Sequence, residues 1–206
     1  MIKSLISYHN RSSRRWEPPR GVTRLIGMRG NGSGPGDLGF WSFVDYAVDR
    51  TAERVPGIDP LAMRMVMTLH RAASMIVYDI ESSVHRPRGW SWPGFRVMFA
   101  LWLAAPVEAR QVAELTGMSR AAVSALVATL ERDGLVARDR APYDGRAVQL
   151  SLTAAGLDAI TSDFRAHNDR ERDWATALTS DEQRTLIGLL DKLAAHSANF
   201  AARHRA

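Results

Sequence analysis

The stretch around residues 119–132 combines small and hydrogen-bonding side chains on the exposed face of a predicted helix. These side chains are Ser119, Arg120, Ala121, Ser124, Ala125, Ala128 and Arg132. Alanine can contact a thymine methyl group, serine can bond a base or a phosphate, and Arg120 can pair with guanine or with the DNA backbone. Such a face suits a helix that enters the major groove of DNA. A bland alanine-rich corner of an ordinary helical domain remains the alternative on this evidence alone.

A second group of residues that could contact DNA follows the helix. Residues 135–140 can form one strand, and Val148, Leu150 and Leu152 alternate with polar residues as in a second, half-buried strand. Residues 141–146, Ala-Pro-Tyr-Asp-Gly-Arg, form a turn-rich tip between the two strands. An arginine at such a tip can enter the narrow minor groove, where the negative potential is strongest. The hairpin therefore favours a DNA-binding winged helix over the alternative of a plain corner.

Two short helices must position these side chains. The second predicted helix begins after Ser119, which suits an N-cap, and Gly134 ends it. Its buried stripe is spaced as on one helical face and comprises Val123, Leu126, Val127 and Leu130. Before the turn at Gly117, a shorter helix has an apolar edge made of Val112 and Leu115. Two helices joined by a glycine-containing turn predict a helix-turn-helix unit.

This region resembles the winged-helix regulators of the MarR family (multiple antibiotic resistance regulators). The matching residues are Leu130-Glu131, Gly134-Leu135-Val136, Asp144-Gly145-Arg146-Ala147 and the run Leu-Ser-Leu-Thr-Ala-Ala-Gly at 150–156. The resemblance implies that Arg146 inserts into the minor groove and that Asp144 braces it. This chain departs from the family at Ala125, where many members place an arginine on the recognition helix.

Helices are also predicted on both sides of the winged unit, at 40–54, from Pro60 to about 82, from 92 to 105, from 154 to about 178, and after a capping box at 179–182. The expected N-caps of the second, third and fourth of these helices are Asp59, Ser91 and Thr153. Their expected apolar faces are Phe40, Phe43, Val44 and Ala47; Leu61, Met65, Leu69, Ala73 and Ile76; and Leu186, Leu190 and Leu193. The resemblance implies that these flanking helices interlace in a two-fold dimer.

The predicted fold is mainly α, with a winged helix-turn-helix, a small two-stranded β wing, and dimerisation helices at both ends. We expect residues 1–38 to be a disordered basic tail and residues 39–206 to form the MarR-like domain. Within that domain, residues 39–105 and 154–206 are the expected dimerisation helices and residues 106–153 the winged helix-turn-helix.

The net charge of +5 is confined to the N-terminal region. Residues 1–40 hold seven Lys or Arg and two Asp or Glu, and the remaining chain has 20 of each sign. Bulk charge therefore gives no support for DNA binding by the folded part, and only the local placement of charges can. The absence of cysteine excludes disulfides, thiol redox chemistry and cysteine metal sites. The apolar run at 97–107 is too short to span a bilayer and no signal peptide is apparent, so a cytoplasmic protein is expected.

Metal chemistry can be read from Asp163, His167 and Glu171, which share one helix face. The neighbouring arginines favour a solvated salt-bridge face instead, because pairs spaced by four residues form readily. His70, His85 and His196 each stand alone and are expected to be packed or solvated. We expect no metal and no cofactor. Because no phosphate loop, nucleophile elbow or pair of catalytic carboxylates is present, we also expect no enzyme activity.

An effector site is implied by the resemblance, since such regulators usually bind a small aromatic or anionic compound between the dimer helices and the winged unit. The candidate lining residues are Tyr78, His85, Trp90, Trp92 and Arg96. Aromatic walls and one cation suit a phenolic carboxylate. The alternative is that the two tryptophans pack the loop and that Arg96 faces water.

The sequence thus predicts a homodimeric transcriptional regulator that binds a palindromic site on double-stranded DNA, acts as a repressor and releases DNA on binding an effector. The alternative is a winged-helix dimer that binds small molecules or proteins without specific DNA readout. The neutral charge outside the N-terminal region favours that alternative slightly.

Overall fold

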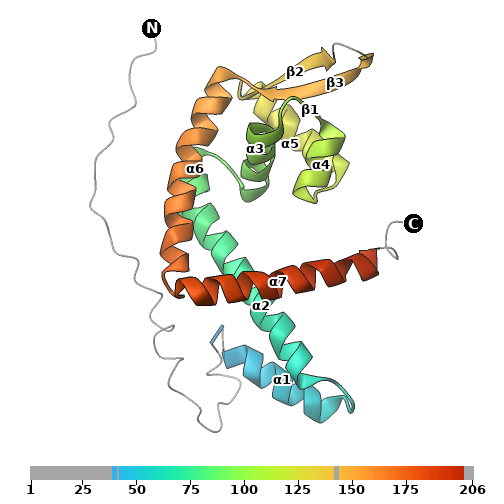
Figure 1. The fold of residues 1–206 in the computed structure, drawn as a ribbon, viewed down its shortest axis with the longest axis vertical. Helices are drawn as coiled ribbons and strands as arrows, with labels where there is room; N and C mark the ends of the chain where they lie inside the picture. The colour runs from blue at the N-terminus through green and yellow to red at the C-terminus, as the bar shows by residue number, and fades with distance from the viewer. Residues whose placement is uncertain (1–38, 41, 142–143, 202–206) are drawn as a thin grey trace. The chain divides into compact units, whose positions relative to one another are not determined.

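The computed structural model describes residues 39–40, 42–141 and 144–201, except for the side chains of 141, 144–147 and 197–201 (Figure 1). The predicted tail, residues 1–38, lies outside the described residues. The chain divides into two compact units, residues 1–72 and 73–206.

The described part of the first unit contains α1 (Ser42–Arg54) and the first half of α2 (Pro60–Ile80). Asp59 caps α2 as predicted, because its Oδ1 accepts hydrogen bonds from the backbone N–H groups of Leu61 and Ala62, each at 3.0 Å. The predicted face of α1 was partly wrong. Val44 and Val48 are buried, whereas Phe43 remains 40% exposed and lies under the Arg71 guanidinium, which is 5.1 Å from its ring centre.

The second unit has one hydrophobic core beneath a small sheet. Helices α3 (Trp92–Ala104), α4 (Ala109–Thr116) and α5 (Arg120–Arg132) lie together on one side of the strands (Figure 1). The fully buried members of this core include Met98 and Leu101 of α3, Leu150 of the sheet and Ile160 of α6 (Ala154–Ala175). Helix α3, which we expected among the dimerisation helices, therefore shares the core of the winged unit.

The sheet is antiparallel, and its strands β1 (Val107–Glu108), β2 (Val136–Ala141) and β3 (Asp144–Leu152) lie in the order β1-β3-β2. Val107 pairs with Leu150, and Val136 pairs with Leu152. The hairpin β2–β3 was predicted, but β1 was not, because a two-residue strand is too short to show a period of two.

Helix α6 begins at the base of the hairpin and leads to α7 (Ser180–Ala201) (Figure 1). Its N-cap Thr153 accepts a hydrogen bond from the N–H of Gly156 at 3.0 Å, as predicted. The helix ends at Ala175 rather than near 178. The predicted capping box also forms, since Glu182 accepts from the N–H of Thr179 and Thr179 from the N–H of Glu182.

Between α2 and α3 the chain continues through a π-helical turn (Glu81–His85) and a 3-10 turn (Arg86–Arg88). The π-helical turn buries Val84 and His85. Ser91 then caps α3 by accepting from the N–H of Gly94 at 3.2 Å. No helix in the described part of the chain is long and apolar enough to cross a membrane.

Two helices present apolar side chains that the single chain leaves exposed. On α2 these are Leu61, Met65, Val66 and Leu69, and on α7 they are Leu186, Ile187, Leu189, Leu190 and Leu193. The predicted apolar stripes are therefore found on α2 and α7, but these side chains do not lie in the core of the single chain. Leu61 is 76% exposed, which is far from the burial expected of a core leucine.

Candidate nucleic-acid interface

Helix α5 has one buried face and one exposed face, as its sequence predicts. Val123, Val127 and Leu130 are buried in the core. The opposite face and the N-terminal end are exposed and consist of Ser119, Arg120, Ala121, Ser124, Ala125 and Ala128. Ser119 Oγ accepts a hydrogen bond from the Ala122 N–H at 3.2 Å, which fixes the start of the helix. A face of short side chains on a fixed helix can approach another surface closely.

The charge on this face is favourable for contact with phosphate, although the whole winged unit is not basic. Residues 117–130 contain no carboxylate, and Arg120 is their one charged residue. The N-terminus of α5 adds the positive end of the helix dipole, which favours an anion. The local placement of charge on α5 therefore favours contact with phosphate, although the net charge of the folded part does not.

The turn before α5 depends on glycine. Gly117 ends α4 with a φ of 66°, a left-handed conformation that other residues rarely adopt. Val112, Ala113 and Thr116 hold α4 in the core, whereas Leu115 is 62% exposed. The prediction that Leu115 belongs to the buried edge of α4 was therefore wrong, because the buried face of this short helix is centred on Val112.

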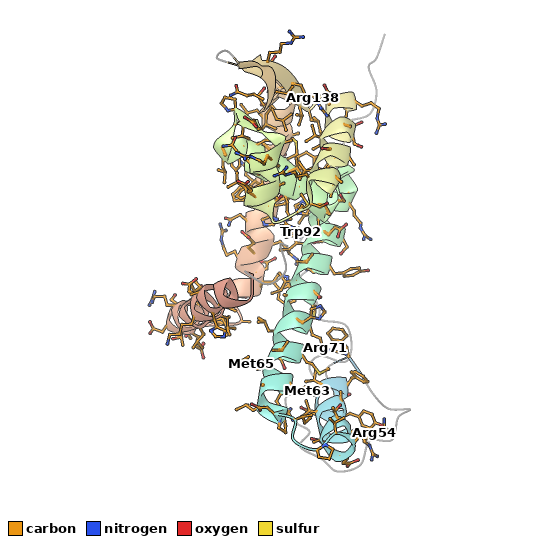
Figure 2. All side chains as sticks on the ribbon, turned by 90° about the vertical axis from the view of Figure 1, so that its right-hand side faces the viewer. Arg54, Met63, Met65, Arg71, Trp92 and Arg138 are labelled. Carbon is orange, nitrogen blue, oxygen red and sulfur yellow. The ribbon has the colours of Figure 1, made fainter. Side chains whose placement is uncertain are left out.

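The wing is held against α5 and α6 by specific contacts. Arg138 on β2 places its Nε 2.8 Å from Glu131 Oε2 at the end of α5 (Arg138 is labelled in Figure 2). Thr153 donates its hydroxyl to the Gly134 carbonyl at 2.7 Å. A Cβ at Gly156 would lie 2.0 Å from the Leu135 carbonyl oxygen, so the chain can pass there only with glycine. These contacts give a physical reason for the spacing of Gly134, Thr153 and Gly156.

The two predicted wing residues, Asp144 and Arg146, belong to β3 by their backbone. Their side chains lie outside the described residues, so their roles at the minor groove stay predictions.

Three of the predicted effector residues, His85, Trp90 and Trp92, lie close together, and the other two do not join them. His85 is buried, and its ring centre lies 5.8 Å from that of Trp92, which is labelled at the start of α3 in Figure 2. Tyr78 is 64% exposed, with the Arg86 guanidinium 5.9 Å from its ring centre. Trp90 packs against the core. Arg96 lies beside Gly117, because its Nη2 would be 3.9 Å from the Cβ of a side chain placed at that glycine.

A buried polar chain was missed by the sequence reasoning. Asp163 and His167 are 0% and 4% exposed, so the prediction of a solvated salt-bridge face was wrong for both. His85, expected to stand alone, lies with its Nδ1 2.7 Å from Asp163 Oδ2 and its Nε2 3.2 Å from His167 Nδ1. His167 Nε2 lies 2.9 Å from Glu171 Oε1. The four-residue spacing on α6 was the available signal, but the approach of His85 depends on the tertiary fold.

A second missed cluster fastens the end of α2 to α6. Arg170 donates from Nε and Nη2 to the two carboxylate oxygens of Asp79, at 2.6 and 2.7 Å. Trp174 Nε1 donates to the same carboxylate at 2.8 Å. Burial raises the pKa of Asp79, but the hydrogen bonds from Arg170 and Trp174 outweigh it, so the pKa lies below its ordinary value.

Known proteins share both the sequence and the fold described above. Residues 93–147, from α3 to the wing, match the family model described as MarR family. The chain is 32% identical over 133 residues to YwaE of Bacillus subtilis (strain 168), an uncharacterised helix-turn-helix transcriptional regulator, and the match covers 65% of this chain and 78% of that protein.

Two solved structures have a similar fold. A mutant MarR from E. coli complexed with operator DNA aligns with a TM-score of 0.59 and 21% identity, covering 69% of this chain and 96% of that one. The PcaV transcriptional regulator from Streptomyces coelicolor, in complex with its natural ligand, aligns with a TM-score of 0.53 and 24% identity, covering 69% of this chain and 94% of that one. The predicted winged helix-turn-helix fold is confirmed, and the chain belongs to the MarR family of transcriptional regulators.

Proposed function

We propose that the chain is a cytoplasmic, non-enzymatic, homodimeric repressor that binds a palindromic DNA site through α5 and the wing. The observation that carries the proposal is the exposed face of α5, which is built from small residues, has no carboxylate before Glu131 at its end and is anchored by Val123, Val127 and Leu130. Such a face fits the major groove. Arg146 would enter the adjacent minor groove, with Asp144 bracing it.

The readout at α5 would be modest for guanine and better for thymine. Ala121 and Ala125 offer methyl groups to thymine, whereas Arg120 is the side chain at the N-terminal end of this face that can make a bidentate contact with guanine. We therefore expect a site in which A·T pairs face Ala121 and Ala125.

The homodimer is supported by the apolar side chains that the single chain leaves exposed on α2 and α7. Exposed leucine and isoleucine on consecutive turns of a helix mark an interaction surface. A two-fold dimer would place two recognition helices about one helical turn of DNA apart, roughly 34 Å, to match a palindromic site.

Response to an effector is proposed from the family and from the position of the aromatic residues. PcaV was solved with its natural ligand, and it shares the fold of this chain. In this chain, Trp90, Trp92 and His85 lie where α3 of the winged unit follows the turns after α2. A small aromatic or anionic compound bound near these residues would release DNA by favouring a dimer whose recognition helices are wrongly spaced.

The alternative function is a winged-helix dimer that binds a small molecule or protein without specific DNA readout. It is favoured by the equal numbers of acidic and basic residues outside residues 1–40. The two functions differ in one measurable property, which is a specific DNA complex that competitor DNA does not abolish.

The test is binding of the purified protein to DNA flanking its own gene, across a salt series, with and without excess random DNA. A specific complex should survive competitor and weaken steeply as salt rises, because counterions are released from the phosphates. A version lacking residues 1–40 serves as the matched control for the basic N-terminal region. Binding that competitor abolishes, or that needs residues 1–40, would refute specific readout by α5 and the wing.

A further inference from the structure

Four side chains form a continuous polar chain between α6 and the π-helical turn that ends at His85. In order they are Asp163, His85, His167 and Glu171, and we call them the histidine chain. The links measure 2.7 Å from Asp163 Oδ2 to His85 Nδ1, 3.2 Å from His85 Nε2 to His167 Nδ1, and 2.9 Å from His167 Nε2 to Glu171 Oε1. Asp163, His85 and His167 are buried, and Glu171 reaches solvent.

The number of protons in this chain is set by its geometry. Each of the three links needs one hydrogen, but two neutral imidazoles carry one N–H each. If both carboxylates are ionised and each accepts a hydrogen bond, the protons sit on His85 Nδ1 and His167 Nε2. The facing nitrogens, His85 Nε2 and His167 Nδ1, are then two lone pairs 3.2 Å apart. One additional proton completes all three links.

The end of the chain at Glu171 behaves as an acceptor. Asn168 Nδ2 donates to Glu171 Oε2 at 3.0 Å, which leaves Oε1 to accept from His167. At the other end, Asp163 Oδ1 is buried without a hydrogen-bond partner, and Arg88 Nε lies 3.5 Å away. A negative charge on Asp163 is therefore only partly compensated, and this favours a positive charge on the neighbouring histidines.

Some features around the two histidines oppose a positive charge on them, and others favour it. Burial lowers the pKa of His167, while Glu171 opposes this shift. Phe95 stacks on both imidazoles, with ring centres 4.2 Å from His85 and 4.6 Å from His167, and aromatic faces attract cations. Burial therefore moves proton uptake by His167 to the acid side of its ordinary pKa.

Several other charged groups on the surrounding elements pair with one another, and Arg165 on α6 is exposed. Helix α3 contributes only aromatic rings to the histidine chain, because its Arg96 lies beside Gly117. Glu81 and Arg86 pair with each other on the turns, and Arg170, toward the C-terminal end of α6, pairs with Asp79 and Asp173. Arg88, Asp163 and Glu171 are therefore the charges that act directly on the two histidines.

A metal ion between the facing nitrogens is the competing occupant. Two imidazoles, each held by a carboxylate, are typical of a zinc site. Such a site needs further donors, and among the described residues no group of three His, Asp or Glu side chains is arranged to hold a metal. The position between the nitrogens is therefore better suited to a proton.

We propose that the histidine chain is a one-proton switch, in which a single proton taken up between His85 and His167 closes the contact between α6 and the turns that precede α3. Helix α6 starts from the wing through Thr153, and α3 lies in the core of the winged unit. Both elements that meet at this contact are thus connected to the winged unit. Uptake of the proton would shift the population of DNA-binding conformations, which makes the regulator responsive to mild acid.

The sharpest test replaces one end of the chain, in the variant Glu171→Gln. The glutamine amide can donate to His167 Nε2 and still accept from Asn168, so His167 can donate from Nδ1 to His85 Nε2. All three links then form without the additional proton. The matched control is Asp169→Asn, which removes a carboxylate from the same helix that pairs with Arg172 and not with a histidine.

The first readout is an NMR titration of the histidine ring signals from pH 8 to pH 5 in the full-length protein. In the wild type and in Asp169→Asn, His85 and His167 should shift together with one midpoint and one proton taken up. In Glu171→Gln that shared step should disappear from this range. Independent titration of the two rings, a step that persists in Glu171→Gln, or stoichiometric zinc in elemental analysis of the purified protein would each overturn the proposal.

The second readout is the pH dependence of DNA affinity, and it rests on the proposed function. Coupling to one proton changes Kd by at most about tenfold per pH unit. We expect a clear slope between pH 7.5 and 5.5 in the wild type and in Asp169→Asn, and a flat profile in Glu171→Gln. Equal slopes in all three proteins would overturn the coupling to DNA. Because the NMR step needs no DNA, failure of the switch is distinguishable from failure of the DNA-binding proposal.

Discussion

Replacing Gly156 with alanine should disturb the point at which the wing joins α6. The new Cβ would lie 2.0 Å from the carbonyl oxygen and 2.9 Å from the carbonyl carbon of Leu135. These are backbone atoms of the residue that leads into β2, so no flexible side chain can move aside. The start of α6 and the start of β2 must therefore separate.

The size of the effect follows from two opposing contributions. Overpacking at a rigid buried site costs about 3 kcal/mol. Alanine is favoured over glycine in a helix by about 1 kcal/mol, which offsets part of that cost. A net loss of about 2 kcal/mol should lower Tm by roughly 4–8 °C for a chain of this size. Because the wing is displaced as well, DNA affinity should fall.

The control is Gly188→Ala on α7, where a new Cβ would meet nothing within 4 Å. That variant should gain up to about 1 kcal/mol from helix propensity alone. Thermal unfolding followed by circular dichroism measures both variants at the same protein concentration. If Gly156→Ala is as stable as the wild type, or if the two variants respond alike, the close approach between α6 and β2 is not the reason for glycine at 156.

Three further predictions concern DNA contact, acid stability and assembly. Arg146→Ala should weaken binding to the specific site by about 1–3 kcal/mol and make the salt dependence shallower; unchanged affinity in a fluorescence-anisotropy titration would remove Arg146 from the interface. Asp79 has a lowered pKa in the folded chain, so its contribution to stability is complete above the ordinary value of 3.8 and is lost as pH falls through the folded value. Asp79→Asn should therefore lower Tm at pH 7, because losing charge-assisted hydrogen bonds costs about 1.5–3 kcal/mol. The difference in Tm from the wild type should narrow at the most acidic pH. An equal Tm difference across a series from pH 7 to pH 3 would contradict the pairing with Arg170. Ile187→Glu places a charge on the exposed apolar face of α7 and should convert a dimer into monomers; an unchanged mass in light scattering would show that this face is not the interface.

Local signals in the sequence were sufficient for most of the secondary structure. Ser91, Ser119 and Thr153 cap their helices as predicted, because a cap is a contact between residues three apart in the chain. The buried stripe of α5 was also predicted, since helical periodicity is a property of one continuous segment. The exposed face of α5 was predicted in the same way, as the side of the helix opposite that stripe.

Apolar periodicity alone did not distinguish a core from an interface. Leu61 and Leu190 stand on correctly predicted apolar stripes, yet the single chain leaves both exposed. An apolar stripe predicts that one face of a helix is covered, but it does not show whether the covering surface belongs to the same chain. Leu115 was misjudged for a related reason, because the buried face of a helix of eight residues is set by its neighbours.

What the sequence by itself determined was therefore the winged helix-turn-helix, its caps, its glycine turn and the exposed face of α5. All of these depend on residues within a few positions of one another. The tertiary structure alone decided the third strand, the Asp79–Arg170 pair and the histidine chain. His85 and His167 are 82 residues apart, and their contact exists only because a π-helical turn and α6 pack around Phe95. Long-range contacts leave no local period, so the residues that carry the proposed proton switch could be recognised only after the fold had brought them together.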